Sequence, residues 1–359
     1  MKILLHGAIK GSNFGDCLFA DIFYNELKKE FPNAEIDFYE NHHFGIGAFL
    51  KNKLNYSVHK HQRVKDYDAL VYISGGLFGE NSKSLLSSIK RFFRYCIPGL
   101  VMIKNKKKIY TVGVEVGPIH YGFLRLVINK ILKYSSLLIV RNKESLNYCK
   151  KNKIANAVLS YDTAFAIDKF QKQLVKKEKN NDCKIILLHT LPNDKLDNEI
   201  KNKILLPIID FVHSHSNYRV IVSADEITNN DYSDIIDFVV NNNVECCLSK
   251  YNDYWKLCEI INQSQIVITR KLHVGIIAAA YNDSVISAPI HSYKTKRLYT
   301  CINEKDRCIP YNSITRKKMS DLLSLYYDRP IILDPEISKK SYDNLQRLCL
   351  ELKKEDKYG

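Results

Sequence analysis

Several common signatures are missing from this chain of 359 residues. Its ten cysteines form no Cys-x-x-Cys pair, which argues against a zinc site or a disulfide framework and is typical of a reduced, intracellular protein. No window of about 18 uncharged apolar residues occurs, so no membrane-spanning helix is expected. The opening M-K-I-L-L-H-G-A has too short an apolar run for a signal peptide, and we therefore expect a cytoplasmic protein.

Signatures of nucleotide, metal and nucleic-acid binding are also missing. The glycine-rich stretch at 7–16 lacks the G-K-[ST] of a Walker loop and is not a clean G-x-G-x-x-G. No spacing typical of metal ligands occurs, and no RNA- or DNA-binding motif accompanies the scattered basic residues. We expect no metal, no organic cofactor and no nucleic-acid partner.

The chain does have a strong positive charge. It contains 54 Lys and Arg against 39 Asp and Glu, a formal net charge of +15. Such a balance favours acidic partners, including phosphorylated small molecules and anionic lipid surfaces. The alternative is that much of the excess is a solvated, Lys-rich surface.

The pattern of short apolar runs predicts a two-domain α/β protein. Strands are expected at 2–6, 35–39, 68–73, 108–113, 136–140, 157–160, 184–189, 218–223, 244–248, 265–269 and 284–287. Segments with helical periodicity lie between most of them, which indicates parallel sheets covered by helices. We expect two Rossmann-like, doubly wound domains that face each other across a cleft. Their expected bounds are 1–170 and 183–325, with a C-terminal helical tail at 335–359.

Unusual residues gather directly after the predicted strands of the first half. Asn13 and Asp16 follow the first strand, and they are either ligand contacts or simple caps of the next helix. Gly75 and Gly76 lie in S-G-G-L-F-G, and Glu115 lies in G-V-E-V-G-P. Ligands of open α/β sheets bind at the carboxyl ends of the strands, so all five are candidate substrate contacts. For the glycines, the alternative is a plain turn.

Two charged residues follow later strands of the same half. Arg141 ends the strand at 136–140, and its planar guanidinium suits a carboxylate or a phosphate. It is alternatively a surface cation paired with Glu144. Asp162 follows the strand at 157–160, where it either caps a turn or orients a substrate hydroxyl.

The segment at 265–281 combines a buried strand with an apolar helix that starts among basic residues. Arg270, Lys271 and His273 crowd this helix start, where the helix dipole prefers acidic groups. A helix end that holds an anion explains this choice, because backbone N–H groups and cations then act together. The alternative is that the cations extend to solvent.

These segments together resemble the polysaccharide pyruvyl transferase family. The matching pieces, in the family's order, are G-S-N-F-G-D at 11–16, S-G-G-L-F-G at 74–79, G-V-E-V-G-P at 113–118, R-N-K-E-S at 141–145, D-T-A-F at 162–165 and K-L-H-V-G-I at 271–276. The resemblance implies the two-domain architecture called GT-B. It also implies transfer of a pyruvyl group from phosphoenolpyruvate onto two hydroxyls of a sugar, which forms a cyclic ketal.

The resemblance also assigns roles to residues. It implies that Arg141 contacts the phosphoenolpyruvate anion and that His273 sits at the reacting group. The family's R-L-H pattern reads K-L-H here, so either Lys271 or Arg270 carries the second donor contact. On chemical grounds His273 is the expected proton donor, and Asp16 or Asp162 the expected base for the sugar hydroxyl.

Two other functions remain open from the sequence. A nucleotide-sugar glycosyltransferase on the same fold often has a Glu pair in its second domain, where the segment at 255–265 of this chain offers Glu259 alone. A non-catalytic relative that acts as a partner in glycan assembly is the second alternative. The acceptor, a sugar of a surface polysaccharide or of its lipid-linked precursor, is not identified by the sequence.

The segment at 88–108 suggests peripheral attachment to the inner face of the cell membrane. It interleaves basic residues with Phe92, Phe93, Tyr95 and Ile97, a mixture that suits a surface with anionic headgroups. The alternative is that the aromatic residues enter the core of the first domain and leave the cations as a solvated rim.

Overall fold

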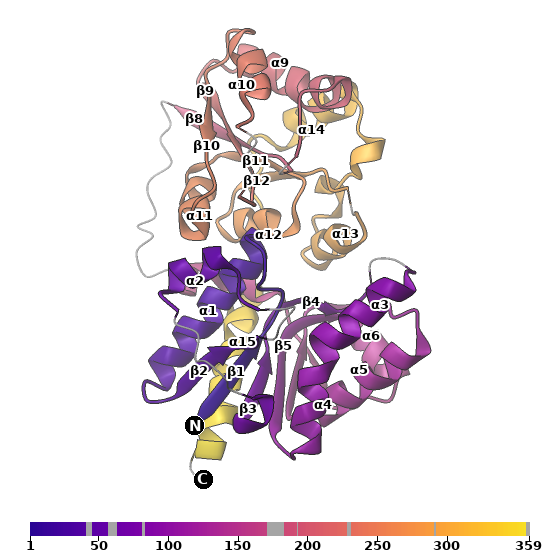
Figure 1. Cartoon of the computed structure of the whole chain (residues 1–359). Coiled ribbons are helices and arrows are strands. Elements are labelled where there is room, and N and C mark those ends of the chain that lie inside the picture. Colours follow the sequence, from indigo (N-terminus) through magenta and orange to yellow (C-terminus); the bar gives the residue numbers. More distant parts are fainter. Residues whose placement is uncertain are drawn as a thin grey trace. The chain divides into compact units, whose positions relative to one another are not determined.

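The computed structural model describes residues 1–40, 45–56, 63–80, 83–170, 183–191, 193–227, 231–290 and 292–356 (Figure 1). The chain divides into two compact units. Unit 1 comprises Met1–Ser12, Asp16–Thr163 and Lys339–Gly359, and unit 2 comprises Asn13–Gly15 and Ala164–Ser338. Each unit is built around one parallel sheet. The predicted fold class, two Rossmann-like α/β domains, is confirmed.

Unit 1 contains a seven-stranded sheet. Its strands are β1 (Lys2–His6), β2 (Glu35–Phe38), β3 (Ala69–Tyr72), β4 (Gly75–Phe78), β5 (Lys108–Val116), β6 (Leu137–Val140) and β7 (Ala157–Leu159). The order is β2-β1-β3-β5-β6-β7, and β4 pairs with β5. All residues of β5 except Lys108 are buried, because helices cover both faces of a parallel sheet. This explains why the strands appear in the sequence as unbroken apolar runs.

Helices complete unit 1. They are α1 (Phe14–Glu30), α2 (Ala48–Leu54), η1 (Val64–Asp66), α3 (Leu85–Arg91), the π-helical turn η2 (Phe92–Cys96), α4 (Ile97–Lys104), α5 (Gly122–Tyr134), α6 (Lys143–Lys151) and α15 (Pro335–Asp356). Helices α4, α5 and α6 contact β5, and α4 also contacts β3. Figure 1 shows these three helices gathered with α3 beside the sheet.

Helix α15 is more than a terminal tail. Its side chains Leu345, Leu348 and Leu352 are fully buried, and most of the helix belongs to unit 1. The Asn344 amide donates to the Tyr161 carbonyl at 3.0 Å. The apolar face of this Lys-rich helix therefore packs on the first unit. The sequence pattern predicted the helix but not where it packs.

Unit 2 contains a five-stranded sheet in the order β10-β9-β8-β11-β12, and all of its pairings are parallel. The strands are β8 (Lys184–His189), β9 (Tyr218–Ser223), β10 (Cys246–Ser249), β11 (Ile266–Thr269) and β12 (Ser284–Ser287). The helices are η3 (Thr163–Ala166), α7 (Ile167–Phe170), α8 (Asn198–Ile200), η4 (Lys201–Leu205), α9 (Leu206–Ser214), α10 (Ser233–Val240), α11 (Tyr254–Gln263), α12 (Leu272–Ala280), α13 (Ser292–Cys301), η5 (Lys305–Arg307), η6 (Tyr311–Ser313) and α14 (Arg316–Tyr326).

The division between the units lies slightly earlier in the chain than the expected end at 170. The long segment of unit 2 begins at Ala164, because helix α7, of which Ile167 and Phe170 are buried, contacts α12 of the second unit. Within the described ranges, no helix is long and apolar enough to cross a membrane. The same residues contain no group of three or more His, Cys, Asp or Glu side chains placed to hold a metal ion.

Candidate active site

The carboxyl edge of the unit 1 sheet holds a buried ion cluster. Arg141 follows β6, Glu115 lies near the end of β5, and Asp162 follows β7. The guanidinium donates from Nη2 to Glu115 Oε2 and from Nη1 to Asp162 Oδ2, each at 2.7 Å. Only 6% of the Arg141 side chain and 2% of each acidic side chain are exposed. The structure therefore brings together three of the residues that the sequence singles out.

The two carboxylates keep Arg141 charged. Burial lowers the pKa of Arg141, but the negative charges of Asp162 and Glu115 outweigh this and raise the pKa above its usual range. The alternative of a surface cation paired with Glu144 is wrong, because Arg141 is buried among the strand ends. A contact between Arg141 and a donor remains a prediction. Removing the guanidinium alone would leave two buried carboxylates uncompensated.

Gly75 and Gly76 do not form the plain turn that was one interpretation of S-G-G-L-F-G. They begin strand β4, and Gly75 pairs with Val114 of β5. Gly75 has a φ of 141°, a conformation that other L-residues rarely adopt, and it lets the chain bend after β3 and enter the sheet again. Their contact with a substrate remains a prediction.

Asp16 lies in the first turn of α1 in unit 1. Burial raises the pKa of the Tyr95 hydroxyl, and the negative charge of Asp16 adds to this effect, while Arg94 and Arg91 oppose it. Asp16 is therefore near enough to Tyr95 for its charge to act there. Its role as a base remains a prediction.

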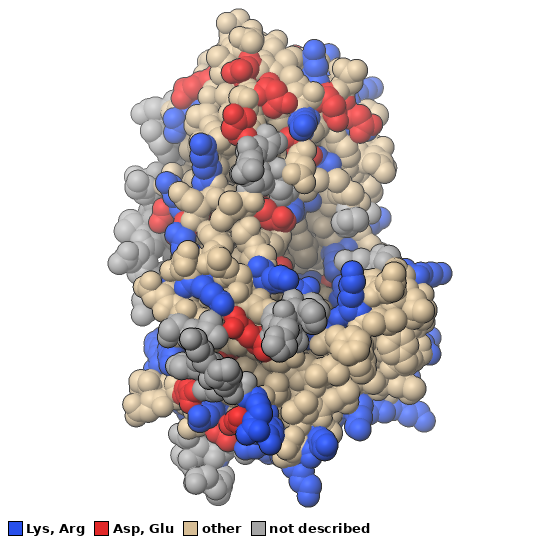
Figure 2. All heavy atoms as spheres, viewed as in Figure 1, with Lys and Arg blue, Asp and Glu red and all other residues tan. Residues whose placement is uncertain are grey.

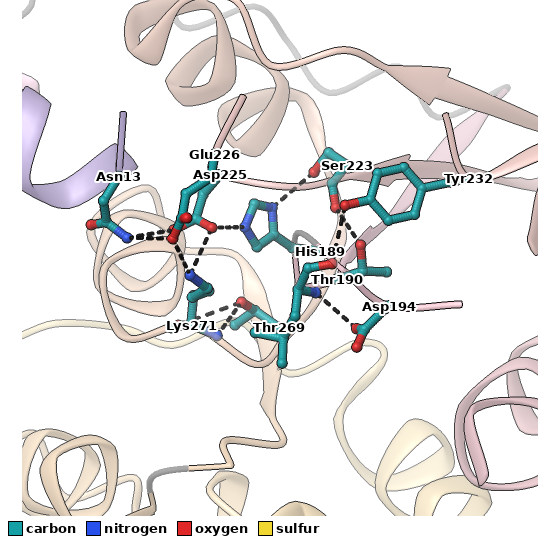
Figure 3. A network of polar contacts seen from close by, with 11 residues as sticks. Asn13, His189, Thr190, Asp194, Ser223, Asp225, Glu226, Tyr232, Thr269 and Lys271 are labelled. Atoms are coloured by element: carbon teal, nitrogen blue, oxygen red, sulfur yellow. Dashed lines mark hydrogen bonds and ion pairs between the residues drawn. The ribbon is translucent and has the colours of Figure 1, made fainter. Parts of the chain in front are cut away.

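A second polar network lies at the carboxyl edge of the unit 2 sheet (Figure 3). Lys271 Nζ lies 2.9 Å from Asp225 Oδ1 and 3.1 Å from Glu226 Oε1. The Asn13 amide donates to the same two carboxylates, at 3.2 Å to Asp225 Oδ2 and 3.4 Å to Glu226 Oε1. The Phe14 backbone amide donates to the Asp225 carbonyl at 3.1 Å. The segments around Asn13 and around Lys271 are therefore linked by the carboxylates of Asp225 and Glu226.

His189 closes this network on its buried side. It ends β8, and its Nδ1 lies 2.8 Å from Ser223 Oγ at the end of β9. Its Nε2 lies 3.9 Å from Asp225 Oδ1 (Figure 3). His189 is fully buried. The imidazole therefore connects two neighbouring strand ends to the carboxylate that holds Lys271.

The contacts of the network shift the pKa values of its charged pair in opposite directions. Burial tends to raise the pKa of Asp225, but His189 and Lys271 outweigh burial and lower it. Burial tends to lower the pKa of Lys271, but Asp225 and Glu226 outweigh it and raise the pKa. Both side chains are therefore ionised across the neutral range.

Arg270 points to a different acid. Its Nη1 donates to Asp194 Oδ2 at 2.7 Å, and its guanidinium carbon lies 3.9 Å from the centre of the Tyr311 ring. Only 10% of the Arg270 side chain is exposed. The ion pair and the aromatic face fix the guanidinium plane, so Arg270 and Lys271 occupy different surroundings although they are neighbours in the chain.

His273 lies in the first turn of α12, against the chain at Gly15. A Cβ atom added to Gly15 would lie only 1.9 Å from His273 Nδ1, so any larger side chain would collide with the ring. Lys271 is the N-cap residue of α12 and provides no side-chain cap. The first N–H groups of a helix are unpaired within the helix and attract anions. His273, Asn13, Arg270 and Lys271 are thus brought to one helix end.

From their place at this helix end, the sequence predicts that Arg270 and Lys271 either hold a bound anion or extend to solvent. The structure shows that neither extends freely, since each already has carboxylate partners. Both cations remain candidates for an anionic ligand, but a ligand has to share or displace these partners.

Sequence reasoning missed five residues of this network: Asp194, His189, Ser223, Asp225 and Glu226. A signal was present, because His189 and Ser223 end predicted strands and the two acids follow the second of these strands directly. Arg141 and Asp162 were selected because they follow the carboxyl ends of predicted strands, and the same criterion selects these four residues. Asp194 lies five residues beyond the end of β8 and carried no comparable signal.

Solved structures with a similar fold are UDP-GlcNAc 2-epimerases. One from Neisseria meningitidis, bound to UDP-GlcNAc, is 11% identical, with a TM-score of 0.63 over 97% of this chain and 99% of that chain. A putative one from Listeria monocytogenes is 12% identical, with a TM-score of 0.61 over 100% and 97%. One from Methanocaldococcus jannaschii is 12% identical, with a TM-score of 0.61 over 97% and 98%. At such identities the likeness shows the fold alone, which is that of two-domain GT-B proteins.

Sequence comparison is more specific. No curated protein matches the chain significantly. The family model described as polysaccharide pyruvyl transferase matches residues 13–288, which include both strand-edge clusters. The match covers most of the chain and includes the loop at Asn13, the Arg141 cluster and the start of α12. This chain belongs to the polysaccharide pyruvyl transferase family.

Proposed function

We propose that this protein transfers the pyruvyl group of phosphoenolpyruvate onto two hydroxyls of one sugar and forms a cyclic ketal. The family supplies the class of reaction. The observation that supports this proposal most is the meeting of the Asn13–Gly15 segment with Lys271 and His273 at one helix end of unit 2. Cations, an imidazole, carboxylates and the amino end of α12 lie together there.

The chemistry needs these types of group. Protonation of the methylene carbon of phosphoenolpyruvate makes its C2 electrophilic, and a sugar hydroxyl then adds to C2 and loses its proton. The bond between C2 and the phosphate oxygen breaks, inorganic phosphate leaves, and a second hydroxyl adds to C2 with loss of its proton. One C–H and two C–O bonds form, while the C=C π bond, one C–O bond and two hydroxyl O–H bonds break. One of the two released protons replaces the proton that the acid donated, and the other leaves with the phosphate. The step requires an acid, a base and cations, and it requires no metal.

We assign these roles to individual residues. His273 is the proposed acid, since an imidazole exchanges protons near neutral pH. Arg270 and Lys271 are proposed to offset the charges of the donor and of the departing phosphate. Asp16, next to Gly15 in the chain, is the proposed base. Asp162 is the less favoured choice, because it bonds to Arg141. Single Asp16→Asn and Asp162→Asn variants distinguish the two, and near-normal rates in both would place the base elsewhere.

Arg141 is proposed to contact the donor anion, as the family resemblance implies. Glu115 and Asp162 would then act by fixing the guanidinium plane through Nη2 and Nη1. Gly75 and Gly76 are proposed to allow close approach of the substrate to the backbone.

We further propose that the acceptor belongs to a surface polysaccharide or to its lipid-linked precursor, and that the protein works in the cytoplasm. Purified protein is to be incubated with phosphoenolpyruvate and a panel of sugars, and phosphate release and product mass are to be measured. Release of phosphate together with a product heavier by one pyruvyl group supports the proposal. Turnover of a nucleotide sugar in place of phosphoenolpyruvate would establish the glycosyltransferase alternative, for which the segment 255–265 offers Glu259 alone, exposed on α11.

A further inference from the structure

Unit 1 carries an apolar surface that the proposed reaction does not use. We define the α3–α5 patch by its members, Leu85, Leu86, Ile89, Phe93, Phe123 and Leu126. These side chains are between 37% and 72% exposed. Leu85, Ile89 and Phe93 are four residues apart on α3 and η2, a spacing that places them on one face. Such a row of exposed apolar side chains is unusual on a helix that is not covered.

The two helices of the patch are connected by aromatic contacts. The Phe92 ring lies 5.4 Å from the Phe93 ring and 6.3 Å from the Phe123 ring, measured between centroids. Leu126 follows Phe123 by three residues and shares its face of α5. The patch is therefore continuous from α3 to α5. Single exposed apolar residues are ordinary, but a continuous patch with a polar rim marks an interaction site.

The rim of the patch is basic. Without Lys104 and Lys106–Lys108, which lie toward the other sheet edge, residues 83–134 contain seven Lys or Arg and one acidic residue, Glu115, which is buried against Arg141. Among the rim cations, Lys90, Arg125 and Lys130 are exposed. Figure 2 shows a broad tan area over α3 and α5, with blue side chains along its edge.

We propose that the α3–α5 patch docks unit 1 on an anionic lipid membrane. Leucine and phenylalanine side chains enter the interfacial region, and the surrounding cations pair with anionic headgroups. A protein partner with an acidic rim would need the same charges, but exposed Lys and Arg side chains around an apolar patch suit anionic headgroups, which need no fixed geometry. Helix α3 follows β4, and α5 follows β5, so the patch begins at the carboxyl edge that carries Arg141.

The docking surface differs from the segment at 88–108 that the sequence suggested. Tyr95 is buried, and Phe92 and Ile97 are half-buried, so only part of that segment reaches the surface. Lys104 and Lys108 lie at the amino end of β5, at the other edge of the sheet from α3. These lysines are therefore outside the patch and serve as controls for charge.

The test is sedimentation with vesicles of phosphatidylcholine alone and of phosphatidylcholine mixed with phosphatidylglycerol, at low and at high salt. We expect binding to the mixed vesicles at low salt, with loss at high salt. Leu86→Ser and Leu126→Ser should each weaken partitioning of the protein to the vesicles roughly tenfold, because each removes a leucine side chain that is proposed to enter the membrane interface. Lys90→Gln and Arg125→Gln should each weaken it about fivefold, the equivalent of about 1 kcal/mol.

Two matched controls accompany these variants. Ile332→Ser removes a still more exposed apolar side chain from unit 2, and Lys104→Gln with Lys108→Gln removes charge from the other sheet edge. Both should sediment like the wild type. The proposal is overturned if the wild type stays in the supernatant at low salt, or if the controls lose as much binding as the patch variants. It is also overturned if ultracentrifugation shows a dimer that Leu86→Ser dissociates and no vesicle binding occurs. Activity on a soluble sugar should be unchanged in all variants, so failure here leaves the proposed reaction intact.

Discussion

The imidazole of His273 lies directly over Gly15, with no room for a side chain between them. A Cβ atom at Gly15 would lie 1.9 Å from Nδ1 and 2.3 Å from the adjacent ring carbon Cγ. The glycine does not have a positive φ, so alanine is compatible with the backbone there. A methyl group at this position therefore acts mainly by displacing the ring.

We expect Gly15→Ala to lower turnover about a hundredfold, the cost typical of moving a reacting group by about 1 Å. The measurement is kcat with phosphoenolpyruvate and an accepted sugar. Gly122→Ala is the matched control, because nothing lies within 4 Å of its added Cβ, and it should behave like the wild type. Normal turnover in Gly15→Ala would show that the position of His273 does not matter for the reaction.

His273→Gln tests the acid itself. Glutamine keeps a polar side chain of similar length but cannot donate the proton, so we expect kcat to fall by about 10²–10⁴-fold. Donor affinity, measured by calorimetry, should change far less. Equal losses in turnover and affinity would make His273 a binding residue only.

Arg141 has two possible roles that one set of variants separates. Arg141→Met alone leaves Glu115 and Asp162 buried without a cation, and we expect a loss of about 3–5 kcal/mol in unfolding free energy. Adding Glu115→Gln and Asp162→Asn removes all three charges and should recover most of that stability. If Arg141 contacts the donor, phosphoenolpyruvate binding stays lost in the stable triple variant. Recovery of donor binding there would make the cluster purely structural.

The pair of Asp225 and Lys271 predicts how stability depends on pH. The Asp225 pKa is lowered from its usual 3.8, so its contribution is present above that pH and is lost as pH falls through the folded-state value. The Lys271 pKa is raised from its usual 10.5, so its contribution is present below that pH and is lost as pH rises through the folded-state value.

Asp225→Asn should therefore be less stable than the wild type by about 3 kcal/mol across the neutral range. Urea unfolding at a series of pH values measures this difference, which should shrink below about pH 4 as the wild-type carboxylate is protonated. Exposed Asp321 on α14 provides the control Asp321→Asn, with no expected change. A difference that persists unchanged in acid would contradict an ionised Asp225.

The sequence predicted most of the fold because parallel strands are short apolar runs with helical segments between them. All eleven expected strands are found, with ends that differ by at most three residues. The missed strand, β4, contains Gly75 and Gly76, which have little strand propensity and signal a turn. Its place in the sheet depends on pairing with β5, a tertiary contact that local pattern does not show.

The candidate site was predicted in position but not in its partners. Residues after strand ends were correctly placed at sheet edges, because parallel strands bring their carboxyl ends together. The pairing of Arg141 with two acids depends on the order of neighbouring strands, which the sequence does not state. The carboxylate partners of Lys271 follow β9, a strand that is not adjacent to β11 in the sheet. Which acidic side chains pair with these cations therefore follows only from the order of the strands in the assembled sheet.

The most direct test of the central claim is the structure of the product made in D₂O from phosphoenolpyruvate labelled with ¹³C at C2. The account predicts a labelled ketal carbon that is coupled to protons at two sugar positions, with a methyl group that carries one deuterium from solvent. Inorganic phosphate should appear in equal amount. A labelled olefinic carbon, which marks an enolpyruvyl ether, or release of phosphate with no labelled sugar would contradict ketal transfer by this protein.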